Sequence, residues 1–288
     1  MSVKNLLWTA LASALLCSCQ QEELSPAFIP DEGEIQLDML YPGASTRVSD
    51  QGFEATDEIG VYVTASDALL QLAGNIVNNE QFTFNGTSWT SSRKVYWNEG
   101  LHNVYAYYPY SKNINDVADY NFDVQVDQST AEGYTKSDFL WSSAFNIKAS
   151  QDPVSMQFQH RLSKVVVELV KGEMFSGDIP SDAEVYILGT VPNALIDLST
   201  GDVTKHDFGA IKPIKCRRVE DGKYTAIVVP QRLTNKQAMV EVIIGNVSYI
   251  MDGTINYYQG YMHTMTITLN QSPEQIEIEI GGNKDDWE

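Results

Sequence analysis

Cysteine is scarce in this sequence. Three occur in 288 residues, and two of them, Cys17 and Cys19, lie close to the N-terminus. Cys216 is therefore the one cysteine in the body of the chain, and it cannot form an internal disulfide there. Stability must come from burial of apolar side chains. The hydrophobic content of 43% is enough for sizeable cores, and the length predicts about two domains.

Positive charge is scarce as well. Lys and Arg total 19 against 38 Asp and Glu, which gives a formal net charge of -19. Nucleic acid and anionic membrane surfaces are bound through clustered cations, so this composition argues against both as partners. Copies of the chain should repel one another. Any assembly must then rest on backbone pairing and on insertion of apolar side chains.

One apolar run stands at the N-terminus. Lys4 precedes it, and residues 6–16 suit a signal peptide but are too short to cross a bilayer as a permanent helix. The run ends in Leu16-Cys17-Ser18-Cys19, which resembles the lipobox of bacterial lipoproteins, where a small residue precedes the acylated cysteine. Ser18 meets that requirement, so Cys19 is the predicted lipidation site, behind a signal peptide at residues 1–18. Two incidental cysteines in an ordinary signal peptide are the alternative.

An acidic stretch follows Cys19. Residues 20–23 are Gln-Gln-Glu-Glu, which resembles the signal that sends lipoproteins of one bacterial phylum to the outer face of the outer membrane. A plain solvated linker would have the same composition, and the sequence leaves both interpretations open.

The body of the chain shows little helical periodicity. Short stretches alternate apolar and polar residues between Gly, Pro, Asn and Asp, at spacings typical of sandwiches, which predicts an all-β fold. Strands are predicted at residues 35–40, 59–64, 95–97, 104–108, 122–126, 154–158, 162–170, 185–188, 224–229, 239–244, 247–251, 262–269 and 275–280. Residues 149–153 are polar and end in Pro153, which predicts a domain boundary near residue 150.

No local pattern indicates an enzyme, a metal site or a cofactor site. The four histidines, at positions 102, 160, 206 and 263, lack a second ligand at metal spacing. Arg217 and Arg218 follow Cys216 and could lower its thiol pKa, but no catalytic signature accompanies it. A glycosidase needs only two carboxylates beside a cleft. Because Asp and Glu are abundant here, the sequence alone does not exclude that activity. We predict no catalytic residue, no metal and no cofactor.

Aromatic residues gather between positions 89 and 110. The group comprises Trp89, Trp97, Tyr105, Tyr107, Tyr108 and Tyr110. Such a group can form a platform on which sugar rings stack. Aromatics also fill sandwich cores, and Tyr105 and Tyr107 fall on one face of a strand by period two, which favours core packing.

Several segments, in order, resemble the fimbrillin-like family of Bacteroidales pilus subunits. They are Ser45-Thr46-Arg47, Phe53, Asp57-Glu58-Ile59-Gly60-Val61-Tyr62, Trp89, Val95-Tyr96-Trp97, Tyr105-Ala106-Tyr107-Tyr108-Pro109, Ser137-Asp138-Phe139-Leu140-Trp141, Phe158-Gln159-His160-Arg161-Leu162-Ser163-Lys164-Val165 and Ile227-Val228-Val229-Pro230. The resemblance implies two transthyretin-like β-sandwich domains in tandem, an acylated precursor and assembly into type V pili by strand exchange.

The resemblance also implies a processing site. In such pilins a protease cuts after an arginine near the N-terminus and frees the acylated segment with its first strand. The matching bond here is Arg47–Val48, and the matching strand is 35–40. The predicted parts are then an acylated propeptide at 19–47 and two sandwiches at 48–150 and 151–288.

The residues themselves agree with a removable strand. Ile35, Leu37 and Met39 fall on one face of the predicted strand, with polar residues on the other. Residues 43–46 are small and polar, typical of an exposed loop open to proteolysis. Loss of the strand would leave unpaired backbone groups and an apolar groove, which another extended strand can fill.

The C-terminal region holds the candidate donor strands. Met265, Ile267 and Leu269 share one face, as do Ile276, Ile278 and Ile280. The expected partners are other pilin subunits, in a homo- or heteropolymer, a host or bacterial surface ligand such as a glycan, and the outer membrane through the lipid before processing. Stalk, tip and anchor roles stay open. A surface glycan-binding lipoprotein that does not polymerise is the alternative function.

Overall fold

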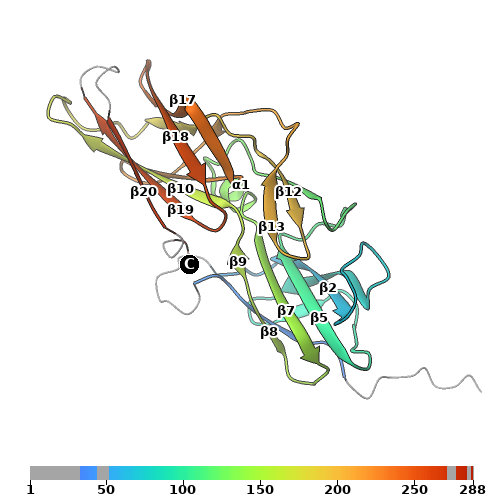
Figure 1. Ribbon diagram of the computed structural model, residues 1–288. Coiled ribbons are helices and arrows are strands. Elements are labelled where there is room, and N and C mark those ends of the chain that lie inside the picture. Colours follow the sequence, from blue (N-terminus) through green and yellow to red (C-terminus); the bar gives the residue numbers. More distant parts are fainter. Residues whose placement is uncertain (1–32, 44–51, 271–276, 284–286, 288) are drawn as a thin grey trace, which may run out of the picture.

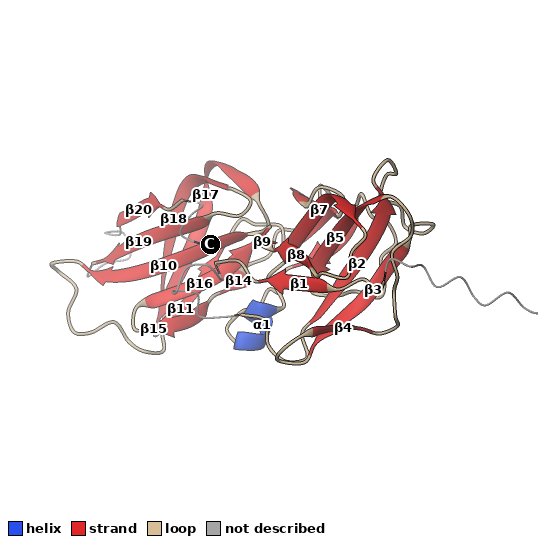
Figure 2. Ribbon diagram, turned by 90° about the horizontal axis from the view of Figure 1, so that it is seen from below, coloured by secondary structure: helices blue, strands red, loops and turns tan. Residues whose placement is uncertain are grey.

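The computed structural model describes residues 33–43, 52–270, 277–283 and 287. Across these residues the protein is nearly all β, as predicted, with a single short helix, α1 (Ala131–Thr135). Figure 2 shows the strands in two groups that lie side by side, with α1 at their junction. Within the same residues, no helix is long and apolar enough to span a membrane.

The first group of strands is built on a six-stranded antiparallel sheet with the order β4-β3-β2-β5-β7-β9. Its strands are β2 (Glu58–Ala65), β3 (Val77–Phe84), β4 (Trp89–Ser91), β5 (Leu101–Tyr108), β7 (Leu140–Lys148) and β9 (Gln159–His160). Across from it lies a two-stranded parallel sheet, β1 (Leu37–Leu40) with β8 (Val154–Gln157).

The second group contains a five-stranded sheet, β15-β16-β10-β19-β20, and a four-stranded sheet, β14-β11-β17-β18. The strands of the first are β15 (Arg217–Glu220), β16 (Lys223–Val228), β10 (Ser163–Lys171), β19 (Met262–Leu269) and β20 (Glu277–Gly281). Those of the second are β14 (Ile214–Lys215), β11 (Glu184–Ile187), β17 (Gln231–Ile244) and β18 (Val247–Tyr257). Figure 1 shows β17 to β20 at the end of the molecule away from β2 and β5.

A three-stranded sheet joins the two halves of the chain. β6 (Tyr120–Asp123) pairs with β12 (Asn193–Asp197), which also pairs with β13 (Asp202–Lys205). β6 precedes residue 150 in the sequence, whereas β12 and β13 follow it. A segment of the first half therefore completes a sheet of the second half.

Two hydrophobic cores follow from this arrangement. The smaller core takes residues from 35 to 158 and includes Trp97 and Phe158, each 1% exposed. The larger core draws on residues from Tyr62 to Trp287. The strand alternation predicted from the sequence places these side chains inside, since successive residues of a strand point to opposite faces.

One glycine explains how β2 and β5 approach each other. Gly60 lies opposite Tyr107, and a Cβ on Gly60 would stand 2.2 Å from the Tyr107 ring. The ring lies over Gly60 because its hydroxyl is held in place, donating to Asn79 Oδ1 at 2.7 Å. A side chain at position 60 would displace that ring.

The predicted strand at 95–97 is shorter than expected. It forms an isolated bridge between Tyr96 and Glu34 rather than a strand. The reason is that the N-terminal segment runs beside it only at residues 33–35 and then turns to pair with β8.

Candidate functional site

The first strand is buried on one face, as its alternation predicts. Ile35, Leu37 and Met39 are 3%, 8% and 6% exposed, and all three belong to the smaller core. Gln36 and Asp38, between them, face solvent. The segment contributes its apolar face to the core and leaves its polar face outside.

This segment pairs with two different parts of the chain. At its start, the Ile35 N–H donates to the Val95 carbonyl at 2.9 Å. Further along, β1 runs parallel to β8, where the Val154 N–H donates to the Gln36 carbonyl at 2.9 Å and the Phe158 N–H to the Leu40 carbonyl at 2.9 Å. One extended segment therefore satisfies backbone groups on both sides of the groove it fills.

Tyr41 holds the far end of the first strand. Its carbonyl accepts a hydrogen bond from the Gln157 side chain at 3.2 Å, and its ring meets Phe53 edge-on at 5.2 Å between centroids. Burial raises the pKa of the Tyr41 hydroxyl above its usual range. Arg47 and Val48, the predicted processing bond, lie outside the described residues, between Gly43 and Gly52.

The candidate donor residues lie on two strands, one inside a sheet and one at its edge. Met265, Ile267 and Leu269 are each 0% exposed in β19, which lies between β10 and β20. β20 is the edge strand of the same sheet, where Ile278 is partly buried and Ile280 is 44% exposed. Ile276 lies outside the described residues.

Trp287, which follows β20 in the sequence, lies at the junction of the two strand groups. It is 8% exposed, and its ring stacks on that of His160 with 4.2 Å between centroids and 11° between planes. In Figure 1 the C-terminus lies beside β9, the strand that carries His160. Sequence reasoning missed this contact, because a lone Trp in an acidic tail carries no pattern.

A cleft of about 750 Å³ opens beside this contact. Tyr41, Asp138, His160 and Trp287 line one part of it, and charged residues of β10, β15 and β16 line another. Burial raises the pKa of Asp57, another lining residue. No group of His, Cys, Asp and Glu suitable for a metal ion is found among the residues that the structure describes.

Cys216 and His102 are both core residues. Burial raises the pKa of the Cys216 thiol well above its usual range, so the group stays protonated and is a poor nucleophile. His102 is 0% exposed and packs against Trp97 at 5.0 Å between ring centroids. The remaining histidines lie apart from both, on β9, on the turn after β13 and on β19.

The aromatic cluster is partly internal. Tyr105, Tyr107 and Trp97 are 6%, 1% and 1% exposed, as the period-two argument favours for the two tyrosines. These three rings are not available to stack on a sugar ring. Trp89, Tyr108 and Tyr110 are half-buried and form the part of the cluster that reaches the surface.

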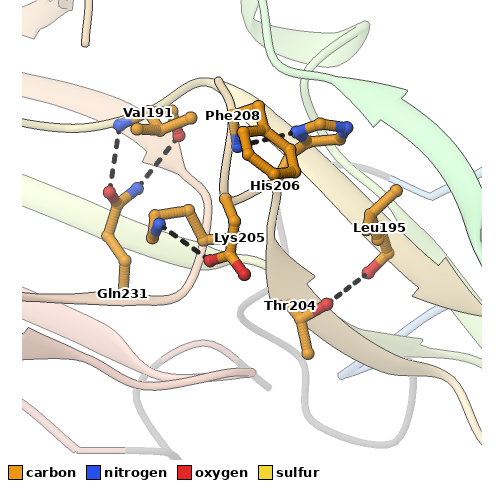
Figure 3. Close-up of polar contacts among 8 residues, drawn as sticks. Val191, Leu195, Thr204, Lys205, His206, Phe208 and Gln231 are labelled. Atoms are coloured by element: carbon orange, nitrogen blue, oxygen red, sulfur yellow. Dashed lines mark hydrogen bonds and ion pairs between the residues drawn. The ribbon is translucent and has the colours of Figure 1, made fainter. Parts of the chain in front are cut away.

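The aromatic side chain of Phe208 is almost fully exposed to solvent. Phe208 is 94% exposed on the turn after β13, and its N–H donates to His206 Nδ1 at 3.2 Å (Figure 3). Nearby, the Gln231 amide bonds both backbone groups of Val191 at 3.0 Å, in the same view. These contacts hold the backbone in place at the turn after β13 and at Val191.

Comparison with known proteins identifies the class. The family model described as fimbrillin-like matches residues 46–287. The chain belongs to the fimbrillin-like family.

Individual relatives agree with that family. A candidate fimbrium tip subunit, Fim1C, from Bacteroides ovatus is 33% identical over 144 residues, which are 43% of this chain and 26% of that protein. The chain thus matches about a quarter of that relative's length. A candidate fimbrium subunit, also Fim1C, from Bacteroides uniformis is 24% identical across 100% of this chain and 96% of its own.

The fold is also found in solved structures. The crystal structure of a candidate cell adhesion protein from Bacteroides uniformis superimposes with a TM-score of 0.70 at 22% identity. It covers 90% of this chain and 100% of that one. At this level of identity the likeness concerns the fold alone.

Proposed function

We propose that this protein is a structural, adhesive subunit of a surface pilus, exported as a lipoprotein and assembled by strand exchange. One observation carries the proposal. The segment 33–40 fills a groove with three buried side chains and pairs with residues on both sides of it. It leads directly toward the segment that contains Arg47. A cut there would separate a core strand from the rest of its core.

The energies involved are large enough to drive assembly. Fully burying a side chain such as Leu or Met contributes roughly 1.5–3 kcal/mol, so the three of the first strand contribute about 5–9 kcal/mol together. Their loss would also leave buried backbone groups of β8 without partners. An emptied groove should therefore bind a replacement strand from another subunit by β-augmentation.

The donor in this proposal is the edge strand β20 with the residues that adjoin it. Withdrawing β19 would expose Met265, Ile267 and Leu269 and split the five-stranded sheet, since β19 lies inside it. β20 is attached along one edge only. Ile278 and Ile280 are thus better placed to leave than the residues of β19, and Ile276 precedes them in the sequence.

Export and location follow from the same proposal. Cys19 carries the lipid, and the precursor of residues 19–288 is held at the outer membrane until it is cut. The processed subunit, with parts at 48–150 and 151–288, joins other subunits at the cell surface. It needs no cofactor and has no catalytic role.

The test is the N-terminus of the mature surface protein. In cells that process the wild type, intact mass should place its first residue at Val48, and an unheated surface fraction should give a ladder of high-mass species. Arg47→Ala should stay an uncut monomer. Arg232→Ala is the matched control, because Arg232 is an exposed arginine within β17, and it should be cut and polymerise normally.

Two results decide against the proposal. A mature protein that still begins at Cys19 would leave a lipoprotein that keeps its first strand. A chain lacking residues 271–288 that is cut and still elongates would exclude β20 as the donor.

A further inference from the structure

His160 contacts the residue that follows the first strand and a residue of the C-terminal tail. The face of its ring stacks on Trp287 at 4.2 Å between centroids, and Tyr41 meets the ring edge-on at 5.9 Å and 84°. Tyr41 directly follows β1, and Trp287 lies beyond β20. The first strand and the C-terminal tail therefore pack against one imidazole.

The imidazole is itself held in place. His160 belongs to β9, where it pairs with Leu140 of β7, and it is 9% exposed. Its Nδ1–H donates to Asp138 Oδ1 at 3.0 Å, and Asp138 is 8% exposed. A buried hydrogen bond to a carboxylate fixes the orientation of the ring. The ring is thus a rigid support for both neighbours.

The described residues of the tail, 277–283 and 287, have few other apolar contacts. Of the five residues of β20, only Ile278 is not exposed. Beyond it, Gly282 has φ of +115°, and a Cβ there would stand 2.1 Å from the Met262 carbonyl oxygen. Only glycine lets the tail cross so close to β19. Among these described residues, the buried ring of Trp287 is then the main apolar anchor.

Tyr41 contacts the imidazole on which this anchor stacks. Tyr41, Asp138, His160 and Trp287 all line one part of the cleft, so removing the Tyr41 side chain would widen it at the imidazole. More water would then reach the His160–Asp138 hydrogen bond and the edge of the stack. Polar and aromatic contacts of this kind weaken when water competes for them.

We propose that His160 couples the first strand to the C-terminal tail, so that departure of Tyr41 loosens Trp287 and β20. The consequence, which rests on the proposed function, is that a subunit losing its own strand also frees its donor. The coupling itself is a property of the uncut chain and needs no processing.

The experiment measures hydrogen exchange of β20 in the uncut, full-length protein. Tyr41→Ala should raise exchange at 277–281 by about fivefold or more, the lower end of ordinary coupling between sites. Tyr96→Ala is the matched control, because Tyr96 also lies beside the first strand, at Glu34, and is partly exposed. It should leave β20 unchanged.

Reciprocity gives a second readout. Trp287→Ala should raise exchange at 37–41 by a similar factor, since coupling between two sites acts equally in both directions. In a His160→Ala background, Tyr41→Ala should have no further effect on β20. If Tyr41→Ala fails to fold, Tyr41→Leu preserves most of the apolar volume while removing the ring.

The outcomes separate this inference from the proposed function. Exchange at β20 that is equal in Tyr41→Ala and Tyr96→Ala overturns the coupling, whatever happens at Arg47. If the coupling is observed and Arg47 is not cut in cells, the inference holds and the proposed function is wrong.

Discussion

Gln128 hydrogen-bonds both backbone polar groups of Ile227. Its Nε2 donates to the Ile227 carbonyl at 2.7 Å, and its Oε1 accepts from the Ile227 N–H at 2.8 Å. β15 pairs with β16 only as far as Thr225, so the side-chain amide takes the place that a longer β15 would fill. Gln128 comes from the first half of the chain and is 0% exposed.

Gln128→Ala should therefore destabilise the protein. It leaves two buried backbone groups unpaired, each costing about 1–3 kcal/mol, so the free energy of unfolding should fall by roughly 2–6 kcal/mol. Urea denaturation measures the change. Gln125→Ala, at an exposed side chain three residues away, should stay within about 0.5 kcal/mol of wild type. Equal stability of the two variants would contradict the role assigned to the amide.

Leu37→Ala tests the burial of the first strand. Truncating a buried leucine typically costs about 2–5 kcal/mol, because both transfer energy and packing are lost. Asp38→Ala, on the exposed face of the same strand, should cost little. Urea denaturation of the uncut protein compares them, and a Leu37 variant as stable as the Asp38 variant would mean that the groove does not depend on this strand.

Cys216 should be unreactive in the folded protein. Burial raises its pKa, so at pH 8 almost no thiolate is present, and the side chain is also shielded from reagents. Alkylation by iodoacetamide, located by peptide mapping, should be at least about 100-fold slower than in denaturant, because burial lowers both the thiolate fraction and the access of the reagent. Cys216→Ser should keep any pilus or binding phenotype. Rapid labelling of the native protein would instead show that the Cys216 thiol is reactive in the folded state.

His263 should make the protein less stable in mild acid. Burial lowers its pKa, and its Nε2 accepts the Tyr258 N–H at 3.1 Å, a bond that protonation of Nε2 would break. The unfolded chain binds the proton at the ordinary pKa of about 6.5, whereas the folded one resists it. This contribution to stability is complete above that pH and is lost as the pH falls through it toward the lowered value.

The comparison that isolates this effect is His263→Gln against wild type. The loss of unfolding free energy between pH 7.5 and 5.5 should be smaller in the variant, because one group that binds protons on unfolding is gone. Equal losses would assign the acid sensitivity to other groups.

Strands with strict alternation could be predicted from the sequence. β19 runs over the predicted residues 262–269, and its buried residues alternate along its whole length. β3 was not predicted, since Asn78, Asn79 and Glu80 break the pattern. Glu80 is 5% exposed and pairs with Arg93 at 2.6 Å, a partner thirteen residues away that no local pattern reveals. The first part of β17 is not predicted either. It begins with Gln231, a polar residue whose partner, Val191, is forty positions away in the sequence.

The candidate site, too, could be predicted from the sequence only in part. The buried face of the first strand follows from local alternation and is confirmed. Its parallel pairing with β8, and the contact of Trp287 with His160, depend on residues distant in the sequence. Period and composition carry no information on such pairs, so only the folded structure could show them.

The pairing of Tyr41 with Gln157 has a consequence for the rate of folding. The two residues are 116 positions apart in the chain. Bringing them together closes a long loop, and contacts between residues so distant in the sequence form slowly. The parallel pairing of β1 with β8 therefore raises the contact order of the fold, whereas the hairpin of β17 and β18 pairs residues that are close in the sequence.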